Sequence, residues 1–368
     1  MRRASPWNST WRVPADARRP APGRRARVTC PRTTANPTRG ARTDVASPPV
    51  LAVTSLGDVT SDLVLDELYG RGVPVVRLDP GTDFTAGTTM AAHFGNHGPS
   101  GTLHTPSRRL DLSAVRSVYW RRPTPYGGAT PATESAETRF AHSQARSGYG
   151  GTLAALPGAL YLNHPWRNRD AEYKPTQLAT AAQVGLDLPP TLLTNDPDAA
   201  KRFVARHAPA VYKPVHAVHL TPDSSGTPAH TIWVRTVEPD EIDDSVAACP
   251  HLFQACVPKV ADIRLAAVGN RFFATRIDID GDHLDWRQDY DVLAYTPVET
   301  PPAVRTAARA YLDAFGLVFG AFDFAVRDDG RWIWLETNPN GQWAFVDGPT
   351  RRKIATALAD HLQRGSAR

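Results

Sequence analysis

From residue 50 onward, short apolar blocks alternate with polar and amphipathic stretches, and this alternation predicts strands and helices in turn. The apolar run at 50–54 predicts a buried strand. The pattern at 62–68 predicts a helix that Gly70 and Gly72 end, and the run at 73–78 predicts a second strand. A strand, a helix and a strand within this length predict a parallel βαβ unit.

The turn after the first strand, at 55–58, holds a single glycine, whereas a dinucleotide-binding fold needs a glycine-rich phosphate turn there. This counts against dinucleotide binding. The pattern as a whole predicts an α/β protein. Further strands are predicted at 101–104, 117–120, 190–194, 210–213, 231–237, 252–257, 262–268 and 271–279. Further helices are predicted within 127–148, at 170–185, between 197 and 209, at 302–315 and at 351–364.

Two apolar runs near the C-terminal end are joined by a turn signal at 327–331, which predicts a β-hairpin. In a strand, residues i and i+2 point to the same face, so Glu336 and Asn338 share a side. The hairpin can bring Asp323, on the preceding run, to that same face. Oxygen ligands of this kind suit Mg²⁺, which usually shares its coordination with substrate phosphates.

A plainer interpretation also fits part of this pattern, because Asp and Asn at the end of a strand commonly form turns. Asp323 favours the metal, since it stands between Phe322 and Phe324, where an unpaired carboxylate is costly to bury. We therefore expect Asp323, Glu336 and Asn338 to form a metal site.

Several cationic residues lie on apolar elements. Lys213 ends an apolar strand, and Lys174 stands near the start of a helix. Each could simply reach solvent, or could bind phosphate as a point charge. Arg264 and Arg276 are candidates for one face of a sheet by alternation, and Arg287 is a third candidate. A solvent-facing arginine on a strand is commonplace, so none of the three is decisive alone.

The net charge of +5 is unevenly distributed. Residues 1–49 hold eleven Arg and two Asp, a charge of +9, whereas the remainder holds 31 basic and 35 acidic residues, a charge of −4. Residues 1–48 show no apolar periodicity, so we expect disorder there. This tail could bind a polyanion or be a superfluous extension. The body lacks the basic excess of a nucleic-acid binder, so no nucleic-acid partner is expected.

Three cysteines occur, at Cys30, Cys249 and Cys256, and their spacing is not that of a metal site. So few cysteines favour a reducing compartment, and we expect a cytoplasmic protein. The sequence contains no apolar run of about 18 residues, which predicts that the chain does not span a membrane.

The ordered set of these residues resembles the ATP-grasp superfamily over about residues 165–345. That resemblance implies ATP and Mg²⁺ as cofactors. It implies that Lys174 and Lys213 hold phosphates, and that a strand hinge brackets the adenine. The loop at 222–228 resembles the one that closes over the phosphates. The hinge would be formed by Gln254, Ala255, Cys256 and Val257.

A narrower resemblance covers almost the whole ordered chain. The motifs are Tyr119-Trp120-Arg121-Arg122-Pro123, Ala171-Glu172-Tyr173-Lys174-Pro175, Lys259 with Asp262-Ile263-Arg264, and Glu336-Thr337-Asn338-Pro339-Asn340-Gly341-Gln342-Trp343. They resemble the graspetide (microviridin-type) ATP-grasp maturases of ribosomal peptides. The phosphate loop departs from the wider superfamily, because 216–230 holds only Gly226.

The resemblance implies an ATP-grasp fold with an N-terminal parallel βαβ pre-ATP-grasp domain. The implied segments are a tail at 1–48, an N-terminal domain at 49–130, a connecting helical segment at 131–165 and an ATP-grasp domain at 166–368. Within the last, the nucleotide lid would span about 190–252 and the catalytic lobe about 253–368.

The implied activity is phosphorylation of Asp or Glu side chains of a precursor peptide, followed by attack of Ser, Thr or Lys side chains. The implied partner is that peptide with its leader segment, and a homodimer is expected. Arg264, Arg276 or Arg287 would stabilise the acyl phosphate. Arg121 and Arg122 are assigned to the substrate acid or to structure; strand alternation predicts that at most one faces the site.

Two other functions stay open. One is an ATP-grasp ligase that adds an amino acid to a small molecule or to a protein tail. The other is a nucleotide-binding regulatory module without ligase activity, which the intact Lys174, Lys213, Asp323, Glu336 and Asn338 disfavour.

Overall fold

The computed structural model of the protein describes residues 47–96, 98–106, 108–127, 135–216, 219–220, 230–231, 234–278, 284 and 294–365. The chain divides into Met1–Val45 and Ala46–Arg368, and the fold below is that of the second unit. The tail at 1–48, the phosphate loop at 222–228 and Arg287 fall largely or wholly outside the described residues, and the predictions at 127–148, 231–237 and 271–279 fall partly outside them.

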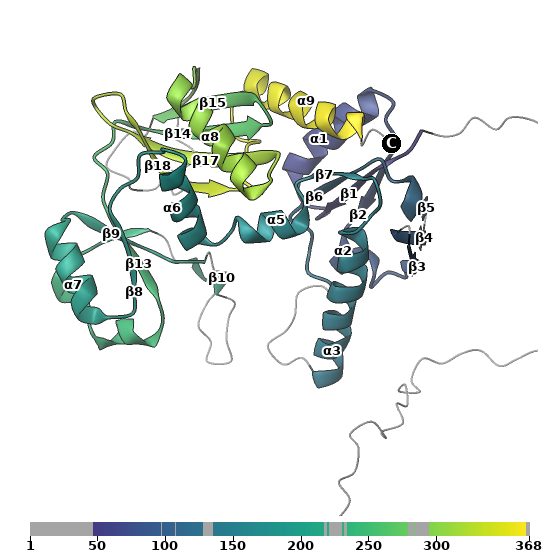
Figure 1. The fold of residues 1–368 in the computed structure, drawn as a ribbon, viewed down its shortest axis with the longest axis horizontal. Helices are drawn as coiled ribbons and strands as arrows, with labels where there is room; N and C mark the ends of the chain where they lie inside the picture. The colour runs from purple at the N-terminus through teal and green to yellow at the C-terminus, as the bar shows by residue number, and fades with distance from the viewer. Residues whose placement is uncertain are drawn as a thin grey trace, which may run out of the picture. The chain divides into compact units, whose positions relative to one another are not determined.

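A four-stranded parallel sheet in the order β2-β1-β6-β7 forms the N-terminal part of this unit (Figure 1). The predicted βαβ unit is confirmed as β1, α1 and β2. An antiparallel sheet of three strands, β3, β4 and β5, follows β2 in the chain. The bounds are β1 Val50–Thr54, α1 Val59–Gly70, β2 Val75–Leu78, α2 Pro80–Asp83, β3 Thr89–Gly95, β4 Gly98–His104, β5 Arg109–Asp111, β6 Ser117–Arg121 and β7 Leu160–Leu162.

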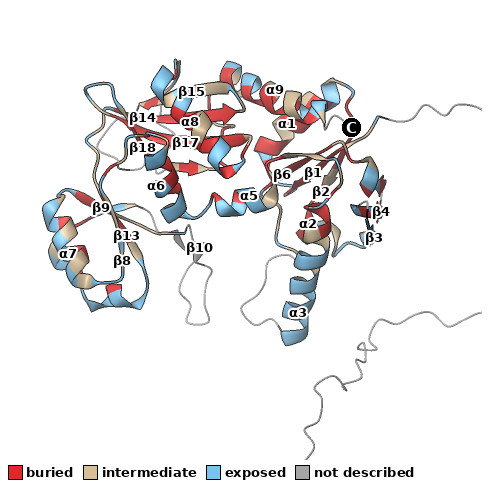
Figure 2. Cartoon of the chain, viewed as in Figure 1, coloured by how far each residue is buried: buried red, intermediate tan, exposed pale blue. Residues whose placement is uncertain are grey.

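Helices connect this sheet to the rest of the unit. The helix expected within 127–148 is α3, which buries none of its residues and is mostly pale blue in Figure 2. The helix expected at 170–185 is α6, which begins at Lys174 and has Pro175 in its first turn, and a separate helix, α5, precedes it. The bounds are α3 Ala136–Ala145, α4 Gly151–Leu153, α5 Pro165–Asp170 and α6 Lys174–Gln183.

A second four-stranded sheet, antiparallel at each pairing, has the order β12-β9-β13-β8 and packs on α7 through Ala200, Val204 and Phe253. The expected boundary between lid and lobe, at 252/253, falls inside β13. That strand pairs with β8 and β9 along its length, so this sheet runs to Ala255. The bounds are β8 Thr191–Thr194, α7 Pro197–Arg206, β9 Ala210–Lys213, β12 Arg235–Val237 and β13 His251–Ala255; β10 His219–Leu220 pairs with β11 His230–Thr231.

A five-stranded antiparallel sheet, in the order β16-β15-β14-β17-β18, forms the C-terminal part. The two predicted hairpins, β14–β15 and β17–β18, are both confirmed. The sequence pattern did not indicate β16. The bounds are β14 Ala261–Val268, β15 Arg271–Asp278, β16 Ala294–Val298, α8 Pro302–Phe315, β17 Phe319–Val326, β18 Trp332–Asn338 and α9 Gly348–Arg364.

The two faces of this sheet are covered differently. Alternate residues of β14 and β17, such as Leu265 and Phe322, pack against Tyr311 of α8 in one core cluster. On the other face, Ala266 and Ala321 belong to a cluster that includes α9, α1 and β1, and Figure 1 shows α9 beside α1. Apolar packing occupies only part of this second face, and polar residues occupy the rest.

Candidate functional site

The predicted metal residues lie on that polar part of the sheet. Asp323 of β17 is paired in register with Glu336 of β18, and Ala321 is paired with Asn338. Directly paired residues of an antiparallel sheet point to the same face, and so do residues i and i+2. All three predicted ligands therefore share one face, as expected.

A β-bulge produces this arrangement. Phe324 pairs with Trp334, whereas Asp323 pairs with Glu336, so Leu335 is an extra residue in β18. A bulge of this kind re-aims the side chains that follow it. In an unbroken ladder Glu336 would pair with Phe322 and point into the apolar core below α8. The bulge places its carboxylate beside Asp323 instead.

Each of the two carboxylates already has a cationic partner. The Arg264 side chain, 6% exposed, pairs with Asp323 at 2.9 Å from Nη1 to Oδ1. Lys174 Nζ lies 2.6 Å from Glu336 Oε2. Lys174 is expected to bind phosphate and Glu336 to bind metal. In the protein alone, the two side chains neutralise each other instead.

Asn338 is held by an Asx turn, in which its Oδ1 accepts a hydrogen bond from the backbone N–H of Asn340 at 3.0 Å. Asn340 is tied on its other sides as well. Its Oδ1 accepts a hydrogen bond from Asn168 Nδ2 at 3.2 Å, and its side chain is hydrogen-bonded to the Glu172 side chain. The Asn-Pro-Asn sequence therefore fixes the amide of the third predicted ligand.

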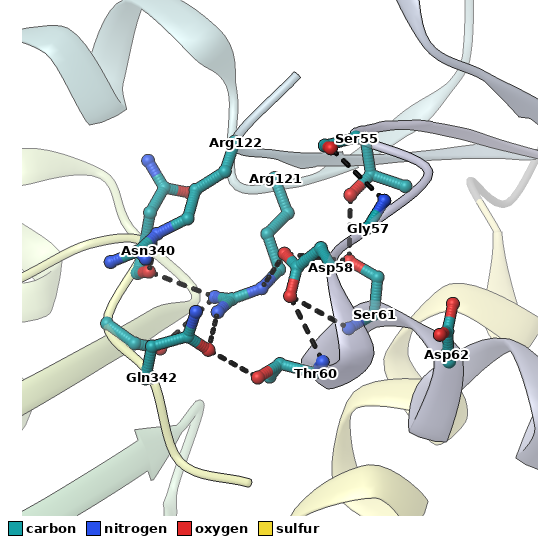
Figure 3. Close-up of polar contacts among 12 residues, drawn as sticks. Ser55, Gly57, Asp58, Thr60, Ser61, Asp62, Arg121, Arg122, Asn340 and Gln342 are labelled. Carbon is teal, nitrogen blue, oxygen red and sulfur yellow. Dashed lines mark hydrogen bonds and ion pairs between the residues drawn. The ribbon is translucent and has the colours of Figure 1, made fainter. Parts of the chain in front are cut away.

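Arg121, at the end of β6, is 2% exposed and contacts the same loop (Figure 3). Its Nη1 donates to the carbonyl oxygens of Asn340 and Gly341 at 3.0 and 3.1 Å, and its Nη2 donates to Gln342 Oε1 at 2.8 Å. Its Nε pairs with Asp58 Oδ2 at 2.8 Å. This placement favours the structural interpretation of Arg121 over substrate binding.

Arg122 also reaches the loop, because its Nε donates to the Asn340 carbonyl at 2.8 Å. Arg121 and Arg122 therefore both contact the Asn340 carbonyl. The strand ends at Arg121, and Arg122 has φ +42°, the only positive φ among the non-glycine residues in the described ranges. The backbone turns there instead of continuing the alternation. Such outliers concentrate at functional sites.

Electrostatics place Arg122 and Glu172 near each other. Desolvation, and then the neighbouring positive charge of Arg121, lowers the pKa of Arg122, and Arg264 adds to this effect. Desolvation raises the pKa of Glu172, while Asn340, His216 and Arg122 act in the opposite direction. Glu172 thus lies near Asn340 and Arg122, and sequence reasoning did not predict this position.

Lys213 forms a second group with the predicted hinge. Its Nζ donates to Gln254 Oε1 at 2.7 Å, and Gln254 Nε2 donates to Thr191 Oγ1 at 2.9 Å. Ala255 ends β13, so Cys256 and Val257 follow the strand in the position of a hinge. His216, three residues beyond Lys213, contributes to the charge environment of Glu172, which connects the two groups.

Arg276 does not share a face with Arg264, so that expectation is wrong. Arg264 pairs with Thr275 and Arg276 with Ile263, which belongs to the core cluster below α8. The register of β14 and β15 therefore turns Arg276 to the opposite side of the sheet. There its Nε pairs with Asp278 Oδ1 at 2.7 Å.

The donor set fits a hard cation. Asp323, Glu336 and Asn338 offer two carboxylates and one amide on one face, and oxygen ligands of this type suit Mg²⁺. A group of three His, Cys, Asp or Glu side chains able to hold a metal does not occur in the described part of the chain.

Solved structures with the same fold include three peptide-modifying ligases. A RiPP-associated ATP-grasp ligase of Chryseobacterium gregarium, in complex with ADP and a leader and core peptide, has 25% identity and a TM-score of 0.77, covering 86% of this chain and 96% of that chain. The macrocyclase MdnC of Microcystis aeruginosa, bound with precursor peptide MdnA, has 25% identity and a TM-score of 0.73, covering 85% and 98%. The macrocyclase MdnB of the same organism has 27% identity and a TM-score of 0.70, covering 86% and 99%.

These likenesses, together with the site, define the class: the protein is an ATP-grasp ligase. The resemblance to graspetide-type maturases, predicted from the sequence motifs, is confirmed, as is the α/β fold with its N-terminal parallel unit. No protein-family model and no curated protein matches the chain. None of the described helices combines the length and apolar character that a membrane span requires.

Proposed function

We propose that this ligase uses ATP to join Asp or Glu side chains of a ribosomally made precursor peptide to Ser, Thr or Lys side chains of that peptide. One observation carries the proposal. Arg264, Asp323, Glu336 and Asn338 lie on one face of the C-terminal sheet, and Lys174 pairs with Glu336 there. Structures of this fold that hold ADP with a leader and core peptide, or a precursor peptide, support it.

ATP and Mg²⁺ are the cofactors that this arrangement suits. Asp323, Glu336 and Asn338 would hold Mg²⁺, which supplies charge neutralisation at the phosphates. Lys174 and Lys213 would hold the phosphates. The residues from Gln254 to Val257 would bracket the adenine. Because Lys174 is paired with Glu336 in the protein alone, its ammonium must exchange a carboxylate for a phosphate when nucleotide binds.

A carboxylate is a poor electrophile, and this determines the chemistry. An oxygen of the peptide's Asp or Glu attacks the γ-phosphorus and ADP leaves, which gives an acyl phosphate. The hydroxyl or amine of the second side chain then attacks the acyl carbon, loses its proton, and phosphate leaves. Each ring therefore removes one water from the peptide.

Arginine is suited to the negative charge that develops in both steps. We assign this role first to Arg264, which lies on the ligand face and pairs with Asp323, and place Arg122 at the edge of the site as a contact for the substrate acid. Arg276 faces the opposite side of its sheet, and Arg287 lies outside the described residues. Both remain candidates from the sequence.

We also propose that the enzyme acts as a homodimer in the cytoplasm, with the precursor peptide as its partner and without nucleic acid. The charge of −4 beyond residue 49 supports the absence of a nucleic-acid partner. The scarcity of cysteine supports the cytoplasm. The assay is light scattering of the purified protein; a monomer at assay concentration would contradict the dimer without affecting the activity.

The decisive experiment incubates the enzyme with ATP, Mg²⁺ and a short peptide encoded nearby that is rich in Ser or Thr and in Asp or Glu. Mass spectrometry should show a loss of about 18 Da per link, as expected for acyl transfer with release of water. Gain of an amino-acid mass would instead identify a ligase that adds a free amino acid. Release of ADP with a small acid, and none with the peptide, would exclude the proposed substrate.

A further inference from the structure

The buried Arg121 joins the N-terminal parallel sheet to the loop that carries the metal ligand (Figure 3). It contacts three successive residues of this loop, which we call the ligand loop and define as 338–342. The contacts are two backbone carbonyls and the Gln342 side chain. A guanidinium fork is suited to holding several acceptors in one geometry, which an ammonium cannot do.

The anchor for Arg121 is itself rigid. Asp58 is the N-cap of α1 and accepts hydrogen bonds from the backbone N–H of Thr60 at 3.0 Å and of Ser61 at 3.4 Å. Ser61 Oγ donates to Asp58 Oδ2 at 3.2 Å, and Thr60 Oγ1 donates to Gln342. The first turn of α1 therefore holds both Arg121 and the end of the ligand loop.

The position of this contact within the fold is informative. Asp58 follows β1, and Arg121 ends the neighbouring strand β6. In the sheet, β2 lies on the outer side of β1 and β7 on the outer side of β6, so the strand order diverges between β1 and β6. The crevice outside the carboxyl ends of two such strands is where open α/β sheets usually bind a ligand. In this protein, the side chain of Gln342 and the carbonyls of Asn340 and Gly341 fill that place.

On its other side, the ligand loop fits closely against β17. A Cβ on Gly341 would lie 2.3 Å from the Cβ of Ala321, so only glycine fits there. The Asn340 carbonyl accepts from Arg121, and the Asn340 N–H donates to Asn338 Oδ1. A shift of Arg121 is thus transmitted through one residue to the amide oxygen of Asn338.

We propose that Arg121 is a positioning residue that fixes the Asn338 amide for Mg²⁺, so that the N-terminal sheet sets the metal affinity of a site in another part of the fold. The inference rests on the proposed Mg²⁺ site. Both adjacent arginines donate to the Asn340 carbonyl, but Arg121 is 2% exposed and also donates to Gly341 and Gln342.

The test measures metal binding without any peptide. Arg121→Lys keeps the charge opposite Asp58 but cannot serve the acceptors of the ligand loop. Calorimetric titration of ADP at a series of Mg²⁺ concentrations should show that the variant needs on the order of tenfold more Mg²⁺ for half-maximal ADP affinity, the lower end of the loss caused by removing an outer partner of a metal ligand. Raised Mg²⁺ should restore ADP binding.

A second arginine near the N-terminal sheet provides a matched control. Arg71, which follows α1, pairs with Asp360 of α9 at 2.7 Å, and its other hydrogen bonds go to Glu67, Thr356 and Gln363 and not to the ligand loop. Arg71→Lys should leave the Mg²⁺ requirement unchanged. An equal shift in both variants, or an unchanged requirement in folded Arg121→Lys, would overturn the inference.

If Arg121→Lys does not fold, Gln342→Leu provides a second comparison, because it removes the side-chain acceptor that Arg121 Nη2 and Thr60 Oγ1 share and leaves Arg121 and Asp58 in place. An unchanged Mg²⁺ requirement in folded Gln342→Leu would then overturn the inference. Because ADP and Mg²⁺ are the only ligands used, the shift can be observed even if the peptide assay fails. Failure of the proposed function and failure of this inference are therefore distinguishable.

Discussion

Lys174 and Glu336 form a 2.6 Å ion pair, although the first is assigned to a phosphate and the second to a metal. Arg264 and Asp323 make the equivalent pair on the neighbouring strands. A buried or half-buried carboxylate without a cation is costly, so these pairs stabilise the site until nucleotide and metal replace them. In the protein alone, the four charged side chains of the proposed site are thus neutralised as two ion pairs.

Lys174→Met should lower ATP turnover by about a hundredfold or more, the effect of removing one stabilising contact to a developing charge. It should also remove the ion pair between Lys174 and Glu336. Steady-state ADP release measures this effect. Lys201→Met, on the exposed face of α7, is the control and should retain activity. Turnover within a few-fold of the unmodified enzyme would remove Lys174 from the site.

The double change Glu336→Gln with Asn338→Ala should abolish ATP turnover and leave folding intact, because it replaces one carboxylate by a neutral amide and removes one amide oxygen without adding a buried charge. Circular dichroism and ADP release measure the two properties. Asp328→Asn, in the exposed turn of the same hairpin, should change neither. Unchanged turnover in the double variant would remove the metal assignment.

Arg264→Lys should reduce turnover far more than Arg276→Lys, because the two side chains lie on opposite faces of the sheet. Lysine cannot reproduce the hydrogen-bonding fork of arginine, so we expect a loss of about a hundredfold for Arg264. Peptide-dependent ADP release is the measurement. Equal losses of turnover in the two variants would show that the face of the sheet on which an arginine lies does not determine its role in catalysis.

Insertion of Ala between Asp323 and Phe324 should remove the bulge, because the new residue would oppose Leu335. Strict alternation would then turn either Asp323 and Glu336 into the core or Phe324 and Trp334 out of it. A buried charge without a partner costs about 3 kcal/mol or more, so urea unfolding should show a large loss of stability together with loss of turnover. Leu335→Val keeps the chain length and should retain both. An insertion variant as stable and active as the control would show that the bulge is unimportant.

His361 should make stability depend on pH. Desolvation, and then the positive charges of Arg364 and Arg271, lowers its pKa, and the Tyr161 backbone opposes this. The folded protein therefore binds fewer protons than the unfolded chain, so the free energy of unfolding falls as the pH drops below the ordinary value of 6.5. His361→Gln should flatten this fall in urea titrations between pH 7 and 5. Parallel profiles would contradict it.

Sequence reasoning predicted the elements of the fold well where a pattern is local. The βαβ unit, both C-terminal hairpins and the helix with Pro175 in its first turn follow from periodicity and turn residues. It missed β16, a short exposed strand that contains Pro297 and pairs only with β15. An edge strand of this composition has no apolar alternation to reveal it.

The sequence by itself determined which residue types are present and in what order: two lysines, a hinge, Asp323, and the Asn-Pro-Asn-Gly-Gln-Trp ending that identified the class. The tertiary structure decided which of them meet. The Leu335 bulge sets the face of Glu336, the β14–β15 register separates Arg264 from Arg276, and a positive φ brings Arg122 to the carbonyl that Arg121 holds. Register and backbone conformation at these points are set by distant packing partners, so no local pattern can contain them.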